Sequence, residues 1–154
     1  MLLDEMRRYL LEGSLGTTAV YCGQMPATPD LAVALFETGG LPSVHAMSTG
    51  PGLALVEQPR VQVVVRHTTY EAARTIMQTA HHRLDGARDV YLTSAACWVG
   101  TKPDVSLGAT WYHWIEAVQQ PFFLRLDEND RVELACNYDV IKDRDAFVEE
   151  GIPI

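Results

Sequence analysis

The sequence contains little lysine and has a deficit of positive charge. Lysine occurs only at Lys102 and Lys142, and 20 acidic residues outnumber 12 basic ones, which gives a net charge of −8. Binding to DNA without sequence preference depends on basic side chains that neutralise phosphates. The sequence shows no cluster of Lys or Arg, so we do not expect a DNA-binding function, although passive contact with passing DNA is compatible with this charge.

Long apolar runs and disulfide patterns are also missing. No run approaches the roughly 20 apolar residues that are needed to cross a bilayer. The first residues, MLLDEMRRYLLEG, mix acids and bases, unlike a signal peptide. Cys22, Cys97 and Cys136 lie far apart without C-x-x-C spacing, which is typical of reduced thiols. We therefore expect that the protein does not associate with a membrane. We expect it to be assembled in the cytoplasm.

Motifs for catalysis, metals and cofactors are absent from the sequence. The adjacent His81 and His82 would diverge by about 100° on a helix, and no H-E-x-x-H or Cys/His spacing occurs. No G-x-S-x-G or phosphate-binding loop is present, and the acidic residues near Asp127 are typical of a solvated turn. The sequence predicts no enzyme activity, no metal and no cofactor.

What the sequence does contain is the pattern of one globular domain, residues 1–154. Leu3, Met6, Leu10 and Leu11 recur at helical spacing and predict a helix over 2–12 that ends at Gly13. The residues favour strands around 16–24, 31–37 and 60–66, and glycines and prolines predict a loop over 38–52.

A helix is predicted to begin sharply at Thr68, since Thr68-x-x-Glu71 matches a capping box. Asp85-Gly86 should end it. The apolar residues of this segment recur every three or four positions and predict its buried face: Tyr70, Ala73, Met77, Ala80 and Leu84.

Residues 87–112 predict two strands joined by a long loop at about 100–108. Residues 111–126 and 131–141 predict a hairpin whose second arm alternates clearly between apolar and polar residues. Pro121 cannot donate a ladder hydrogen bond, so the first arm needs a bulge or an edge there. Together, these segments predict an α+β fold: a mostly antiparallel sheet of about five or six strands with two helices packed on one face.

Three stretches resemble one known family. They are ALFETGGLPSVHAM (34–47), EQPRVQVVVRHTTYEAAR (57–74) and WIEAVQQPFFLRLDENDRVELACNYDV (114–140). Together they resemble the phage minor capsid proteins that are grouped with the tail terminators of siphophages, over most of residues 1–142. The stretch near 95–108 looks longer than the corresponding hairpin of the family.

The resemblance implies a virion structural protein without catalytic residues or cofactors. Such proteins form a ring, typically a hexamer, at the head-proximal end of the tail tube. The implied partners are further copies of the chain, the tail tube protein and the head connector, with genomic DNA only passing through the lumen. The alternatives are another neck or tail component, such as a head-closure adaptor, or a small hydrolase.

A ring needs heterologous contacts, in which one face of a subunit meets a different face of the next. Apolar residues on or next to the two long loops, 38–52 and 95–108, indicate a partner surface, although they could instead anchor these loops to the core. The candidate interface residues are Leu41, Val44, Met47, Leu53 and Trp98. The aromatic residues around 111–123 favour core packing and an interface over stacking on bases or sugars.

Overall fold

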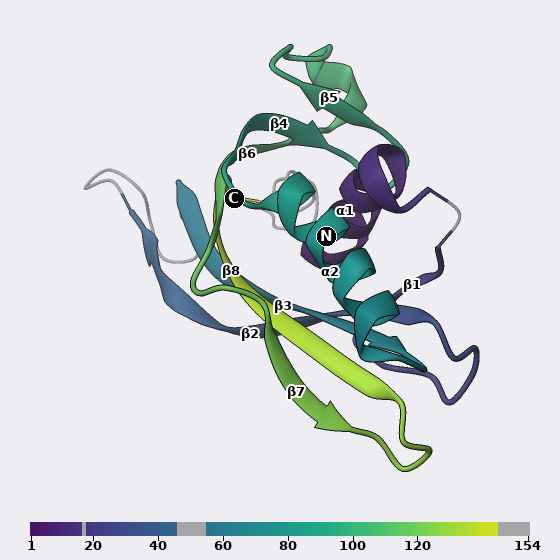
Figure 1. Cartoon of the computed structure of the whole chain (residues 1–154). Helices are drawn as coiled ribbons and strands as arrows, with labels where there is room; N and C mark the ends of the chain where they lie inside the picture. Colours follow the sequence, from purple (N-terminus) through teal and green to yellow (C-terminus); the bar gives the residue numbers. More distant parts are fainter. Residues whose placement is uncertain (17, 46–54, 145–154) are drawn as a thin grey trace.

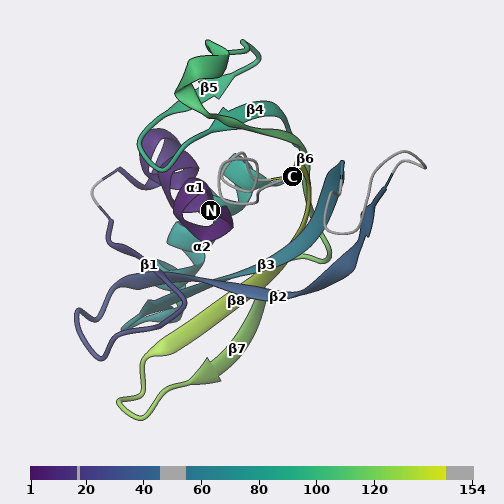
Figure 2. The same cartoon turned by 180° about the vertical axis from the view of Figure 1, so that it is seen from behind.

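The computed structural model describes residues 1–16, 18–45 and 55–144. In this part of the chain, one curled sheet of eight strands encloses two α-helices, as Figures 1 and 2 show from opposite sides. The strands are β1 (Val20–Cys22), β2 (Ala32–Val44), β3 (Val56–His67), β4 (Ala87–Leu92), β5 (Cys97–Val99), β6 (Thr110–Ala117), β7 (Phe122–Leu126) and β8 (Val132–Asp143). The helices are α1 (Leu2–Leu10), which continues as the π-helical turn η1 (Leu11–Leu15), and α2 (Tyr70–Leu84); a 3-10 turn, η2, spans Val105–Leu107.

The strands follow the order β1-β2-β3-β8-β6-β4-β5, and β7 pairs with β8 beyond the end of β6. Only the pair β1–β2 is parallel; every other pairing of the described strands is antiparallel. The predicted α+β class is therefore right, but the sheet has more strands than expected. The strands that were not predicted separately are short, since β5 has three residues and β7 has five.

Both helices pack on the same face of the sheet and build the core there. The predicted stripe of α2 is buried at Ala73, Met77, Ala80 and Leu84, whereas Tyr70 is half exposed. The alternation of β8 is confirmed, and its inward side chains all join the core: Val132, Leu134, Cys136, Tyr138 and Val140. The helical and strand periodicities of the sequence thus converge on one apolar core.

The helix boundaries differ from the predictions. Gly13 does not end the first helix, because the chain continues through η1 to Gly16, which adopts a positive φ of 53°. A β-carbon at Gly13 would lie 2.0 Å from Nε of Arg83, so this glycine makes room for a side chain of α2. The second helix is capped by Thr69 rather than Thr68: the Thr69 hydroxyl accepts from the amide of Ala72.

The predicted loop over 38–52 is wrong in its first part, since β2 runs on to Val44. Glycine and proline suggested a break, but β2 remains paired with β3 through two register shifts. The later part of the predicted loop lies mostly outside the described residues.

The region after α2 has three strands, β4, β5 and β6, where two were predicted. The loop at 100–108 is confirmed, and it includes η2. The predicted hairpin is also confirmed, with its first arm divided at Pro121 into β6 and β7, which pair with different parts of β8.

Candidate subunit interface

The outer edge of β2 is the longest unpaired strand edge among the described residues. β1 covers only Val33–Leu35 of β2, whereas β2 itself runs from Ala32 to Val44. Residues 36–44, here called the arm edge, therefore have β3 on one side and no strand of the described chain on the other. An unpaired edge presents backbone donors and acceptors that another chain can use.

The arm edge carries two of the five predicted interface residues. Leu41 is 61 % exposed and Val44 is 48 % exposed. Register shifts on both sides of Leu41 bend the strand, and β-bulges of this kind redirect side chains. At the first shift Gly40 lies so close to β3 that a β-carbon would be 2.7 Å from Cα of Pro59. The Glu-Thr-Gly-Gly stretch is thus a bulge that turns apolar side chains outward.

Two ion pairs join β3, the strand beside the arm edge, to β8. Nζ of Lys142 lies 2.9 Å from Oε2 of Glu57, and the Lys142 side chain is only 1 % exposed. Nε of Arg60 donates to Oδ1 of Asp139 at 2.7 Å. Because both pairs join β3 to β8, they hold in place the strand on which the arm edge rests.

A second apolar surface is formed by residues 93–109, here called the 93–109 excursion. It leaves the sheet after β4, returns as β5, and passes through η2 before β6 begins. Figure 1 shows it at the opposite end of the sheet from β7. Its exposed apolar side chains are Val99, Val105 and Leu107, and Val105 reaches 80 % exposure.

Trp98 lies in β5 rather than in a loop, and it is half buried. It pairs across the strands with Tyr91, which in turn pairs with Trp111. The rings of Tyr91 and Trp111 stack with their centres 5.8 Å apart. Trp98 therefore continues a row of aromatic side chains on the face away from the helices, and only part of it is open to a partner.

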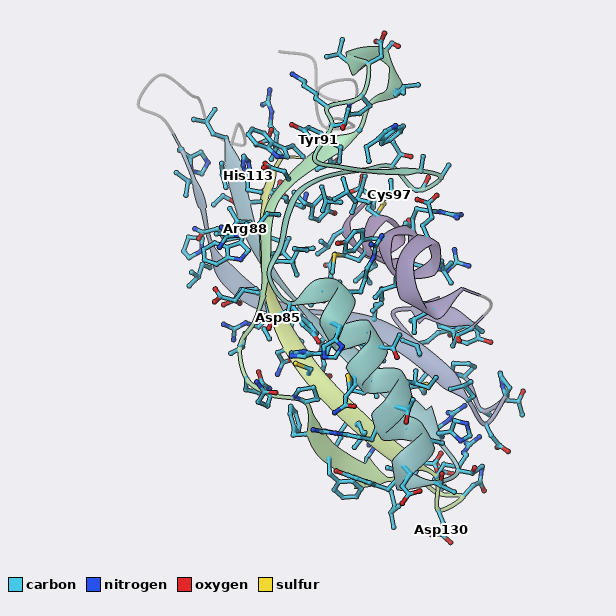
Figure 3. All side chains as sticks on the ribbon, turned by 45° about the horizontal axis from the view of Figure 1, so that its top comes forward. Asp85, Arg88, Tyr91, Cys97, His113 and Asp130 are labelled. Carbon is cyan, nitrogen blue, oxygen red and sulfur yellow. The ribbon has the colours of Figure 1, made fainter. Side chains whose placement is uncertain are left out.

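A third apolar surface was missed by the sequence analysis. β7 pairs only with β8 among the described strands, and Phe123, Leu124 and Leu126 on it are 51 %, 38 % and 54 % exposed. Figure 3 shows the tip of the β7–β8 hairpin, marked by Asp130, just beyond the end of α2. The run FFLRL is mostly apolar, and such a composition is typical of a buried strand. The sequence therefore did not predict that this strand is exposed.

The five predicted interface residues do not form one cluster. Leu41 and Val44 lie on the arm edge and Trp98 lies in the 93–109 excursion, which project from different sides of the molecule (Figure 1). Met47 and Leu53 lie outside the described residues. The separation suits a subunit that contacts two neighbours with different faces.

Chemistry-bearing side chains meet in small groups in the described part of the chain. No three His, Cys, Asp or Glu side chains there gather closely enough to hold a metal ion. Two histidines make close polar contacts: Nδ1 of His81 lies 2.8 Å from the Tyr138 hydroxyl oxygen, and Nε2 of His113 lies 2.7 Å from Oδ1 of Asp143. Burial lowers the pKa of His81 and raises that of Tyr138, so both stay neutral near pH 7. The His81–Tyr138 pair links α2 to β8.

The family model of the bacteriophage tail terminator protein matches residues 9–144. The chain belongs to this family. No match is found among curated proteins. The matched residues include all three apolar surfaces, from the arm edge to the β7 edge.

Membership in the tail terminator family makes the chain a structural component of a phage tail, which interacts with other tail components. The paucity of chemical motifs in the sequence agrees with a structural family. No helix among the described residues is long and apolar enough to span a membrane.

Proposed function

We propose that the chain forms a closed ring, a hexamer, that ends the tail tube and joins it to the head connector. The main support is the position of apolar side chains on separate sides of the described molecule, on the arm edge and on the 93–109 excursion. Head-to-tail contacts between two different surfaces of each subunit give a ring when the rotation from one subunit to the next closes on itself.

In the proposed ring, the arm edge of one subunit packs against the 93–109 excursion of the next. Leu41 and Val44 supply the first surface, and Val105, with the open part of Trp98, supplies the second. Met47 and Leu53 follow the arm edge in sequence and remain in the proposed interface. The faces that are left meet the tail tube protein on one side of the ring and the connector on the other.

The ring is assembled in the host cytoplasm and lets genomic DNA pass through its lumen without holding it. The net charge of −8 supports this part of the proposal, because like charges repel DNA along the bore. Measurable binding of the assembled ring to DNA at physiological salt would contradict it.

The test uses two variants that each damage one surface. Leu41→Asp/Val44→Asp places charges on the arm edge, and Val105→Asp places one on the excursion. Tyr70→Asp is the matched control, since Tyr70 is 50 % exposed on α2, outside both surfaces. Each interface variant should keep the circular dichroism spectrum of the folded monomer, yet fail to close tails in an in vitro assembly assay, whereas the control should close them.

A mixture of the two interface variants separates head-to-tail contact from other arrangements. Each damaged subunit retains one intact surface, so the mixture should form dimers that do not grow into rings, as measured by light scattering and native mass spectrometry. Normal ring closure by either variant alone would disprove the assigned surfaces. Electron microscopy that locates the protein away from the head–tail joint of particles would disprove the terminator position itself.

A further inference from the structure

A groove of about 510 Å³ opens on the face of the sheet that points away from the helices. Its floor contains Tyr91 of β4 and Trp111 of β6, which alternate with the core residues Val90 and Tyr112. One wall is the chain from Lys102 to Thr110, and the other is formed where β3 begins and β8 ends. The groove therefore lies where four segments that are distant in sequence meet.

The aromatic floor of the groove is rigidly arranged. The Tyr91 and Trp111 rings are nearly parallel, at an angle of 9°. Nε1 of Trp111 donates to Oδ1 of Asp89 at 3.2 Å, and the His113 ring lies beside Trp111 with the ring centres 3.9 Å apart. His113 is held in turn by Asp143 at 2.7 Å (Figure 3 shows Tyr91 and His113). Preorganised aromatic surface binds an apolar side chain at a low entropic cost.

The described chain ends at this groove. Asp143 is the last residue of β8, and both Asp143 and Arg144 line the groove. Ten residues follow, with the sequence DAFVEEGIPI. Ten extended residues span at most about 33–36 Å, which is ample to follow a groove from one of its own walls.

The apolar residues of this segment suit the groove. Phe147, Val148, Ile152 and Ile154 are apolar and match a lining that includes apolar side chains. The segment also has three acidic residues and no basic one, whereas Lys102 and Arg144 bring basic groups to the groove. Asp104 and Asp143 also line the groove and balance these two charges, so the match between segment and groove rests on apolar side chains against an aromatic floor.

We propose that the C-terminal segment, residues 145–154, docks in the groove of its own subunit, with Phe147 against Tyr91 and Trp111. The covalent link favours the subunit's own groove over that of another copy, because a short linker gives an effective concentration in the millimolar range. The proposal does not depend on ring formation. It assigns the aromatic floor of the groove to the chain's own end, and leaves Leu107 of η2, which does not line the groove, for other contacts.

The experiment compares the full chain with two variants by ¹⁵N nuclear magnetic resonance. One variant stops after Arg144, and the other carries Phe147→Ala in the full chain. The indole N–H signal of Trp111, assigned with a Trp111→Phe variant, should shift in both. Phe123→Ala removes an exposed aromatic ring from β7 and should leave that signal in place.

Adding the synthetic peptide of residues 145–154 to the truncated chain should return the Trp111 signal to its original position in a saturable manner. The shift in the full chain should not change between about 20 and 500 µM protein, as an intramolecular contact requires. Unchanged Trp111 signals in both the truncated and the Phe147→Ala variants would overturn the proposal. A shift that depends on concentration would also overturn it, since the segment would then bind a second copy.

Discussion

The hydroxyl of Tyr112 donates a hydrogen bond to Oε1 of Glu5 at 2.7 Å and so links β6 to α1 inside the core. The hydroxyl of Thr110 donates to the other carboxylate oxygen at 3.0 Å, and Glu5 is only 4 % exposed. A carboxylate is costly to bury unless hydrogen bonds replace its water. These two donors therefore allow an acidic residue to lie among apolar side chains of the first helix.

Tyr112→Phe should lower the free energy of unfolding by about 1–3 kcal/mol, because it removes one donor from a buried acceptor while it keeps the ring in the core. Urea denaturation followed by circular dichroism measures the change. Tyr70→Phe is the control and should lie within about 0.5 kcal/mol of the natural chain, since Tyr70 is half exposed. Equal stability of the two variants would show that the bond to Glu5 contributes nothing.

Gly40→Val should displace the arm edge while the rest of the sheet stays folded. Any β-carbon at Gly40 would lie 2.1 Å from the carbonyl oxygen of Gln58, which belongs to the backbone and cannot turn away. Amide signals of β2 beyond Thr38 should move, and tail closure should be lost, with a decrease of about 1–3 kcal/mol in stability from the strain.

The neighbouring glycine supplies a control for that prediction. A β-carbon at Gly39 meets nothing within 4 Å, so Gly39→Val should be tolerated in both assays. If Gly40→Val were as harmless as Gly39→Val, the position of the arm edge would not depend on the close approach of β2 and β3 at Gly40.

The elements that the sequence predicted best are those in which one periodic pattern decides burial. The alternation of β8 and the stripe of α2 each point to the same core, so local residues were enough to place them. Lys142 continues the inward alternation of β8 and is buried, but its charge hides this in the sequence. Its partner Glu57 lies 85 positions earlier, and no local pattern predicts such a pair.

The candidate interface was harder to predict because exposure depends on distant neighbours. Gly39 and Gly40 indicated a loop, since the sequence does not reveal that β3 lies alongside to form a bulge. The β7 edge was missed because the sequence shows that Phe123 is apolar but not that β8 is its only partner strand among those described. Strand order, unlike strand content, is set by contacts between remote segments.

Arg66→Met should destabilise the protein by about 1–3 kcal/mol. The Arg66 guanidinium is buried and donates to the carbonyl oxygens of Pro26, Pro29 and Asp30, so it holds the connection between β1 and β2 against the sheet. Methionine keeps the apolar stem but leaves these acceptors without a donor. Thermal unfolding and limited proteolysis of this connection provide the measurements.

Arg60→Met tests whether the effect of Arg66→Met is specific to its position. Arg60 also carries a guanidinium on β3, but its side chain is 35 % exposed and pairs with a half-exposed Asp139. Exposed pairs contribute little, so Arg60→Met should cost less than about 1 kcal/mol. A larger loss for Arg60→Met than for Arg66→Met would contradict the assigned role of Arg66.

His81 should make the protein less stable as the pH falls below about 6.5, the ordinary pKa of an unfolded histidine. Burial lowers the pKa of His81, with smaller contributions in the same direction from His82 and Arg74, while Asp85 opposes the shift. Between the lowered pKa and about 6.5 the unfolded chain binds more protons than the folded one, so the free energy of unfolding decreases with acidification. His81→Gln should remove part of this slope in urea denaturation between pH 7 and 5, up to the equivalent of one proton. His82→Gln, at the exposed neighbouring position, should retain it, and equal slopes for both variants would exclude His81 as the source.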